Sequence, residues 1–222
     1  MKLCMFHPVD HPMQRGWVGR IDGEHVVELA AQTLQSFFTG GGAAREHADF
    51  RIDGVQFLAP VLHPPAVRVF EDETSFWFAN PAAMVGPGAE VGGAQILLPR
   101  VAAIVGADGA LGGFTGFAEW RDPTRTPPKD RDFALGLGPA VVTPDELEAP
   151  VDVTVRVDGV ERLRRRSDVD WKAVRDLAAE GTRLYPGDLL AGPALGEVDV
   201  SAGAAVEIEV SGVGILEQTV AS

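Results

Sequence analysis

The chain contains a single cysteine, Cys4, among its 222 residues. No disulfide can form within it, and zinc sites built on pairs of cysteines are excluded. It also lacks an apolar run long enough to cross a membrane, and its first residues do not form the apolar stretch of a secretion signal. These absences predict a soluble, cytoplasmic protein with no membrane partner. Cys4 lies in an expected early strand and is predicted to be buried rather than nucleophilic.

Positive charge is also scarce. The chain has 19 Lys and Arg against 32 Asp and Glu, a net charge of −13. A surface of this sign repels phosphate backbones, so nucleic acid is not an expected partner. The one basic run, residues 162–166, has acidic residues on both sides and is predicted to be a solvated strand-to-turn segment.

What the chain has in excess is turn residues. It contains 26 Gly and 16 Pro, and 45% of its residues are hydrophobic. Many turns in a globular composition favour a fold built from short strands over a helical bundle. We therefore predict an α+β fold that is mainly β.

The first 54 residues read as a small β-rich domain. Residues 1–6, 16–21 and 25–29 are expected strands, and Asp22-Gly23 between the last two is typical of a hairpin turn. A short amphipathic helix is predicted around Leu34, Phe37 and Phe38. The glycines at 40–42 end it and begin an expected linker through residue 54.

The larger domain is predicted over residues 55–222. Short apolar or alternating segments follow one another there, separated by Gly, Pro or Asp, as in a β-barrel or roll. One helix interrupts them. Asp168 or Asp170 is its expected cap, its apolar face begins at Trp171, and Gly181 ends it.

Seven segments of this domain, in fixed order, resemble the fumarylacetoacetate hydrolase family. They are FLAPV with PPAVR (57–61, 64–68), FWFANPAAMVGPG (76–88), VAAIVG (101–106), GFT (113–115), RDFA with LGPAVVT (131–134, 137–143), LYPGDLL (184–190) and GVGIL (212–216). The resemblance implies a β-roll or barrel main domain, a small N-terminal domain in front of it, and pairing into homodimers.

The resemblance also implies a catalytic metal that this chain is not equipped to bind. Family members hold Mg²⁺, Mn²⁺ or Ca²⁺ through four carboxylates, and such cations require anionic oxygen ligands. The corresponding positions here are Val69, Leu98, Arg100 and Glu119. One carboxylate remains and one ligand has become a fixed positive charge, so we expect the metal site to be lost and no cofactor to be used.

Other family features are changed as well. The helix that carries the His and Glu of hydrolytic members is absent, because residues 70–75 bridge the gap directly. The family's lysine before its Asp-Phe pair corresponds to Arg131, and Lys129 is an alternative if the loop shifts. Arg131, Lys129, Trp77 and Trp120 are the expected substrate-binding residues, the aromatic pair as core or cavity wall.

Two interpretations of Arg100 and Glu119 remain open. They could form a salt bridge that fills a disused cavity, because each buried charge needs a partner. Alternatively, Arg100 replaces the metal as the cation, Glu119 acts as general acid or base, and Arg131 anchors an anionic substrate.

Three functions follow. The first is a metal-independent lyase, isomerase or cyclase of biosynthesis that acts on a small oxo acid or β-dicarbonyl compound. The second is a non-catalytic ligand-binding or scaffold protein that keeps the fold. The third is a metal-dependent hydrolase or decarboxylase whose ligands include carboxylates such as Glu71 or Asp122.

Overall fold

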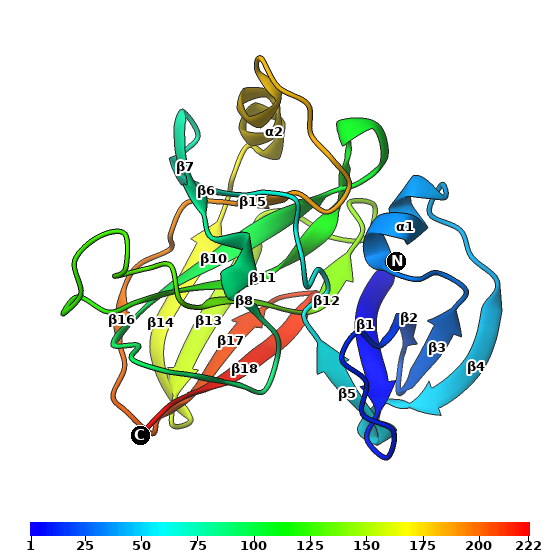
Figure 1. Ribbon diagram of the computed structural model, residues 1–222, viewed down its shortest axis with the longest axis horizontal. Helices are drawn as coiled ribbons and strands as arrows, with labels where there is room; N and C mark the ends of the chain where they lie inside the picture. Colours follow the sequence, from blue (N-terminus) through cyan, green and yellow to red (C-terminus); the bar gives the residue numbers. More distant parts are fainter.

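The computed structural model describes residues 1–222 as two β-sheets with two short α-helices (Figure 1). The strands are β1 (Lys2–Pro8), β2 (Trp17–Asp22), β3 (His25–Leu29), β4 (Glu46–Arg51), β5 (Val55–Leu58), β6 (Val67–Asp72), β7 (Ser75–Ala79), β8 (Met84–Val85), β9 (Ala89–Val91), β10 (Ile96–Val105), β11 (Leu111–Arg121), β12 (Leu135–Val142), β13 (Val151–Val157), β14 (Val160–Ser167), β15 (Leu189–Ala191), β16 (Val198–Asp199), β17 (Ala205–Val210) and β18 (Gly214–Val220). The helices are α1 (Leu34–Thr39) and α2 (Trp171–Ala179), and 3₁₀ turns occupy Ile52–Gly54, Pro81–Ala83 and Ala107–Gly109. The predicted mainly-β fold is confirmed.

The larger sheet runs β4-β3-β2-β1-β12-β11-β10-β15-β6-β7, and the smaller one runs β14-β13-β17-β18-β9. Figure 1 shows β1 to β4 and α1 together on the right and α2 at the top. The N-terminal strands therefore continue the larger sheet through the antiparallel pairing of β1 with β12.

Alternation along β10 and β11 decides which side chains lie between the sheets. Leu97, Val101 and Ala103 point toward the smaller sheet and join the largest buried cluster, which includes Ile208 and Leu216. The intervening residues point to the opposite face, where a second cluster contains Ala102, Ile104 and Phe117. The predicted site residues Arg100 and Glu119 share that second face.

The N-terminal predictions are largely confirmed. β2 and β3 form the expected hairpin, with Gly23 at a φ of 58° in its turn. Helix α1 buries Leu34, Phe37 and Phe38, and Thr33 caps its start. The expected linker is wrong in part, because Glu46–Arg51 is strand β4, paired with β3. Five of its six residues are exposed, so it lacks the apolar alternation that identifies a strand in a sequence.

The division of the chain at residue 54 remains a prediction. Strand β5, assigned to the larger domain, pairs with β1 of the first unit.

Helix α2 lies where it was predicted, with the Asp170 carboxylate accepting from the backbone N–H groups of Lys172 and Ala173. The basic run lies on β14, where most side chains are exposed, as expected. Neither helix is long and apolar enough to span a membrane.

Cys4 is fully buried, and that burial raises the pKa of its thiol to about 12. The thiolate is the reactive form, so at neutral pH its population is lower than in an ordinary cysteine by about three powers of ten. We expect the native protein to react with a disulfide reagent such as DTNB more than about a thousandfold more slowly than the guanidinium-unfolded chain. Equal rates in the two states would contradict a buried, protonated Cys4.

Candidate active site: a buried arginine–glutamate pair

Arg100 and Glu119 are brought together by neighbouring strands. In the antiparallel ladder of β10 and β11, Leu98 lies opposite Glu119 and Arg100 lies opposite Phe117. Arg100 and Glu119 are therefore diagonal neighbours on one face, within reach of each other's long side chains. Both are buried, at 4% and 0% exposure. The structure thus contains the salt bridge that the first interpretation describes, and the roles of the two residues stay predictions.

The Arg100 guanidinium is held by four hydrogen bonds. Its Nε and Nη2 donate to Glu119 Oε2 at 3.0 and 2.6 Å. Its Nη1 donates to the backbone carbonyls of Phe70 and Gly192 at 2.8 and 2.7 Å. Burial lowers the pKa of Arg100 from its ordinary value, and the charge and hydrogen bonds of Glu119 act against that shift. Almost all of its N–H groups are therefore directed at the protein itself.

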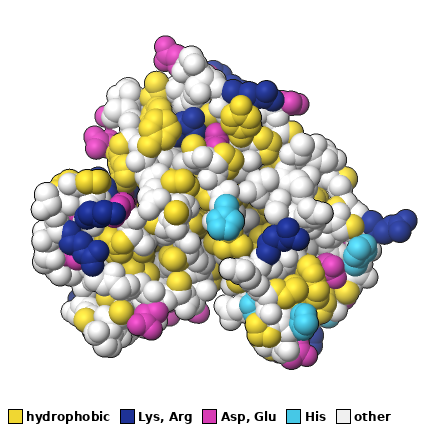
Figure 2. Space-filling model, viewed as in Figure 1, with side chains coloured by type: hydrophobic (Ala, Val, Ile, Leu, Met, Phe, Trp, Pro, Cys, Tyr) yellow, Lys and Arg dark blue, Asp and Glu magenta, His cyan; other side chains and the backbone are white.

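The second oxygen of Glu119 is in a different position. Oε1 is buried and accepts no hydrogen bond, and Nη1 of Arg131 lies 3.8 Å from it. The Arg131 guanidinium lies over the ring of Trp77, 5.0 Å from its centroid, an arrangement that favours a cation on an aromatic face. Arg131 is about 29% exposed and comes from the loop between β11 and β12. Figure 2 shows cationic side chains at the left of the molecule, where this loop lies.

The donor set around this pair does not fit a divalent cation. Val69 and Leu98, at two of the four expected ligand positions, are buried and apolar. Glu119 is the one carboxylate among the four, and two guanidinium groups approach it. No group of three or more His, Cys, Asp or Glu side chains anywhere in the structure is placed to hold a metal ion. Asp122 instead binds Arg125 and Thr124, and Glu71 is exposed.

Two of the expected substrate-binding residues lie outside this cluster. Trp120 follows Glu119 directly, so its side chain points to the other face of β11, where its Nε1 donates to Gln218 Oε1 at 2.8 Å. Lys129 is exposed and forms an ion pair with Asp132 at 2.7 Å. The structure therefore brings together Arg100, Glu119, Arg131 and Trp77.

A second buried ion pair was not predicted. Arg68 Nη1 lies 3.2 Å from Asp188 Oδ2, and both side chains are at most 5% exposed. Arg68 Nε and Asp188 Oδ1 have no hydrogen-bond partner. The sequence offered one indication of this pair. Arg68 is an isolated charge within the apolar strand segment at residues 67–70, and a buried charge requires a partner.

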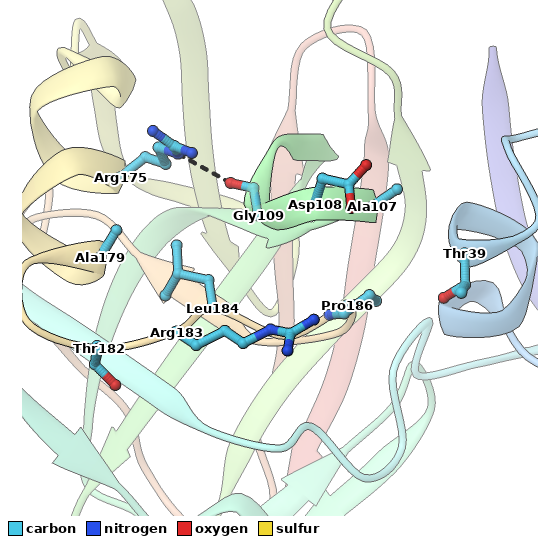
Figure 3. A pocket seen from close by; sticks show the side chains of 10 residues that line it. All are labelled: Thr39, Ala107, Asp108, Gly109, Arg175, Ala179, Thr182, Arg183, Leu184 and Pro186. Atoms are coloured by element: carbon cyan, nitrogen blue, oxygen red, sulfur yellow. Dashed lines mark hydrogen bonds between the residues drawn. The ribbon is translucent and has the colours of Figure 1, made fainter.

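None of the five main cavities is lined by Arg100, Glu119, Arg131 or Trp77. The largest, about 630 Å³, lies between the Ala107–Gly109 turn, the end of α2 and residues 182–186 (Figure 3). Arg175 and Arg183 line it, but Arg175 is already occupied by the Gly109 carbonyl and by Asp176. The predicted site therefore has no main cavity of its own.

Residues 117–221 match the family model described as the fumarylacetoacetate hydrolase C-terminal domain. The whole chain has the fold of solved structures of this kind. Residues 117–221 therefore belong to the fumarylacetoacetate hydrolase family, and the rest of the chain shares the fold of these structures.

Three solved structures with this fold cover 100% of the chain and 99% of their own length, each with a TM-score of 0.81. They are a 5-carboxymethyl-2-hydroxymuconate delta-isomerase from Mycobacterium smegmatis at 19% identity, a maleylpyruvate hydrolase from Sphingobium sp. SYK-6 with manganese(II) and pyruvate at 18%, and a fumarylacetoacetate hydrolase from Exiguobacterium antarcticum at 19%. A comparison with curated protein sequences finds no match. Within the fumarylacetoacetate hydrolase family, isomerases and hydrolases thus share the fold, and the fold alone does not select between them.

Proposed function

We propose that this chain is a non-catalytic ligand-binding or scaffold member of the fumarylacetoacetate hydrolase family, and that it has lost metal-dependent chemistry. The observation that carries the proposal is the bonding of Arg100. Its guanidinium is buried and donates four hydrogen bonds to groups within the protein, two of them to Glu119. Breaking such a pair to admit a metal or substrate would leave a buried charge unpaired, which typically costs about 3–5 kcal/mol.

The maleylpyruvate hydrolase structure holds manganese(II) and pyruvate, and a metal in such a site is expected to be ligated by oxygen-bearing side chains. In this chain, Val69 and Leu98 offer none and Arg100 repels a cation. We expect the protein, after dialysis, to carry no stoichiometric Mg²⁺ or Mn²⁺ by elemental analysis. Its melting temperature should also be unchanged by millimolar Mn²⁺. One equivalent of metal that stays bound through dialysis would overturn the proposal. Metal-dependent hydrolysis would then be the favoured function.

A second candidate is a metal-independent lyase, isomerase or cyclase acting on a small oxo acid. One observation favours it, the unpartnered Oε1 of Glu119 beside Arg131. In this scheme Arg131 binds the substrate carboxylate. Glu119 Oε1 takes a proton from the carbon next to the carbonyl group, and the electron pair of that C–H bond passes to the carbonyl oxygen as an enolate.

Deuterium exchange separates the two candidates. An enolising enzyme exchanges the methyl protons of pyruvate or the methylene protons of oxaloacetate with D₂O, which proton NMR follows directly. The non-catalytic proposal predicts exchange at the background rate. Accelerated exchange that is lost in Glu119→Gln and kept in Lys129→Gln would instead support the enzyme, since Lys129 lies on the same loop outside the cluster. Pairing into a homodimer, which the resemblance implies, stays a prediction for light scattering to test.

A further inference from the structure

A cavity of about 340 Å³ lies between the N-terminal strands and the start of the larger domain. Its lining comes from Met5 of β1, the loop before β2, the start of α1 and the segment that follows β5. Figure 1 shows these segments side by side, where the cyan β5 leads up past the blue N-terminal strands. The volume equals the liquid share of about eleven waters and lies within the ~300–1,000 Å³ range of small-molecule sites.

The floor of this cavity is apolar. Met5 and Pro60 are buried, and Leu62 is partly buried beside them. Such a floor favours a ligand with an apolar body, since each square ångström of apolar surface removed from water contributes about 25 cal/mol.

Four of the polar side chains that line the cavity have no partner within the protein. Gln14, Arg15, Gln35 and His63 line the cavity, and none of their side chains makes a hydrogen bond or ion pair within the protein. The side chain of Gln35 packs against Gly187, whose φ is 91°. Because Gly187 has no side chain, it leaves room for Gln35 in this position. The amides, imidazole and guanidinium thus converge on one space with unused hydrogen-bonding capacity.

The charge of the cavity is opposite to that of the molecule. The chain carries −13, yet no Asp or Glu lines this space and Arg15 supplies its one permanent charge. A guanidinium binds a carboxylate through two parallel hydrogen bonds. Together with the apolar floor, this selects a small carboxylic acid with an apolar body over a cation or a neutral sugar.

We propose that this cavity is a binding site for a small apolar monocarboxylate, with Arg15 on the carboxylate and Met5, Pro60 and Leu62 beneath the apolar body. Gln35 and His63 supply further polar contacts from the facing wall. The site is separate from Glu119 and does not depend on whether Glu119 catalyses. It also gives the N-terminal segment a role, because residues before and after position 54 both line the cavity.

Titration of the full chain with benzoate and hexanoate, followed by calorimetry and by the NMR signal of the His63 ring, tests the proposal. We expect saturable binding of one carboxylate per chain, no binding of the neutral benzamide, and at least a tenfold loss of affinity in Arg15→Gln. The matched control is Arg45→Gln, which removes the same charge from another exposed arginine without an ion pair and should change the affinity less than twofold.

Absence of saturable binding, or equal losses in the two variants, would overturn the proposal. The metal and exchange experiments report on Glu119, whereas this titration reports on Arg15, so either conclusion can fail without the other.

Discussion

Replacing Glu119 with leucine is expected to lower the free energy of unfolding by about 3–5 kcal/mol. The substitution leaves the Arg100 guanidinium buried at 4% exposure with its charge partner removed. Arg100→Met is expected to lose a similar amount, because Glu119 would then retain only the distant Arg131, 3.8 Å away. Urea unfolding of each variant measures these losses.

The double variant separates charge pairing from packing. In Arg100→Met with Glu119→Leu no buried charge is left unpaired, so we expect a loss no greater than that of the worse single variant. Full recovery is not expected, since the carbonyls of Phe70 and Gly192 lose their donor and each unsatisfied buried group costs about 1–3 kcal/mol. Additive losses would show that the two side chains are not energetically coupled.

Arg166 and Asp152 provide a matched control. They are also an arginine–carboxylate pair on neighbouring strands, 3.1 Å apart, but their side chains are 65% and 52% exposed. Water screens such a pair, so removing either partner is expected to leave the free energy of unfolding nearly unchanged. The contrast between the two pairs isolates the contribution of burial.

The salt bridge between Arg100 and Glu119 was one of the two interpretations that the sequence left open. Arg100 and Glu119 each lie inside an apolar strand, and the register of the family segments placed these strands next to each other. The side of β11 to which Trp120 points could also be predicted from the sequence, because residues adjacent in a strand point to opposite sides. A substrate-binding role for Trp120 beside Glu119 therefore conflicts with the alternation of side chains along β11.

Other features could not be predicted from the local sequence pattern. Arg68 and Asp188 are 120 positions apart, and they meet because β6 and β15 run parallel in the sheet. Strand β4 is recognisable from its pairing with β3, whereas its own residues are mostly polar and exposed. The hydrogen bonds of Arg100 to two carbonyls depend on the path of residues 70 and 192, which no side-chain pattern records. These are the contacts that decide whether Arg100 is available to a ligand.

Rebuilding the four family carboxylates should create a metal site that the natural chain lacks. Val69→Asp, Leu98→Glu and Arg100→Glu would join Glu119 on β6, β10 and β11, whose side chains at these positions share one face of the larger sheet. Without metal, the buried carboxylates repel one another and the variant should be less stable than the natural protein. Mn²⁺ should then stabilise it, by about 2.7 kcal/mol at a concentration one hundred times the dissociation constant.

Thermal unfolding in Mn²⁺ and in EDTA measures this difference. The control variant Val69→Asn, Leu98→Gln, Arg100→Gln has side chains of the same shape without the added negative charges, so Mn²⁺ should leave its melting temperature unchanged. A rebuilt chain that does not respond to Mn²⁺ would show that these four positions do not converge as the family resemblance implies. If the natural chain responded instead, Arg100 would not be the barrier to metal binding, and the non-catalytic proposal would lose its support.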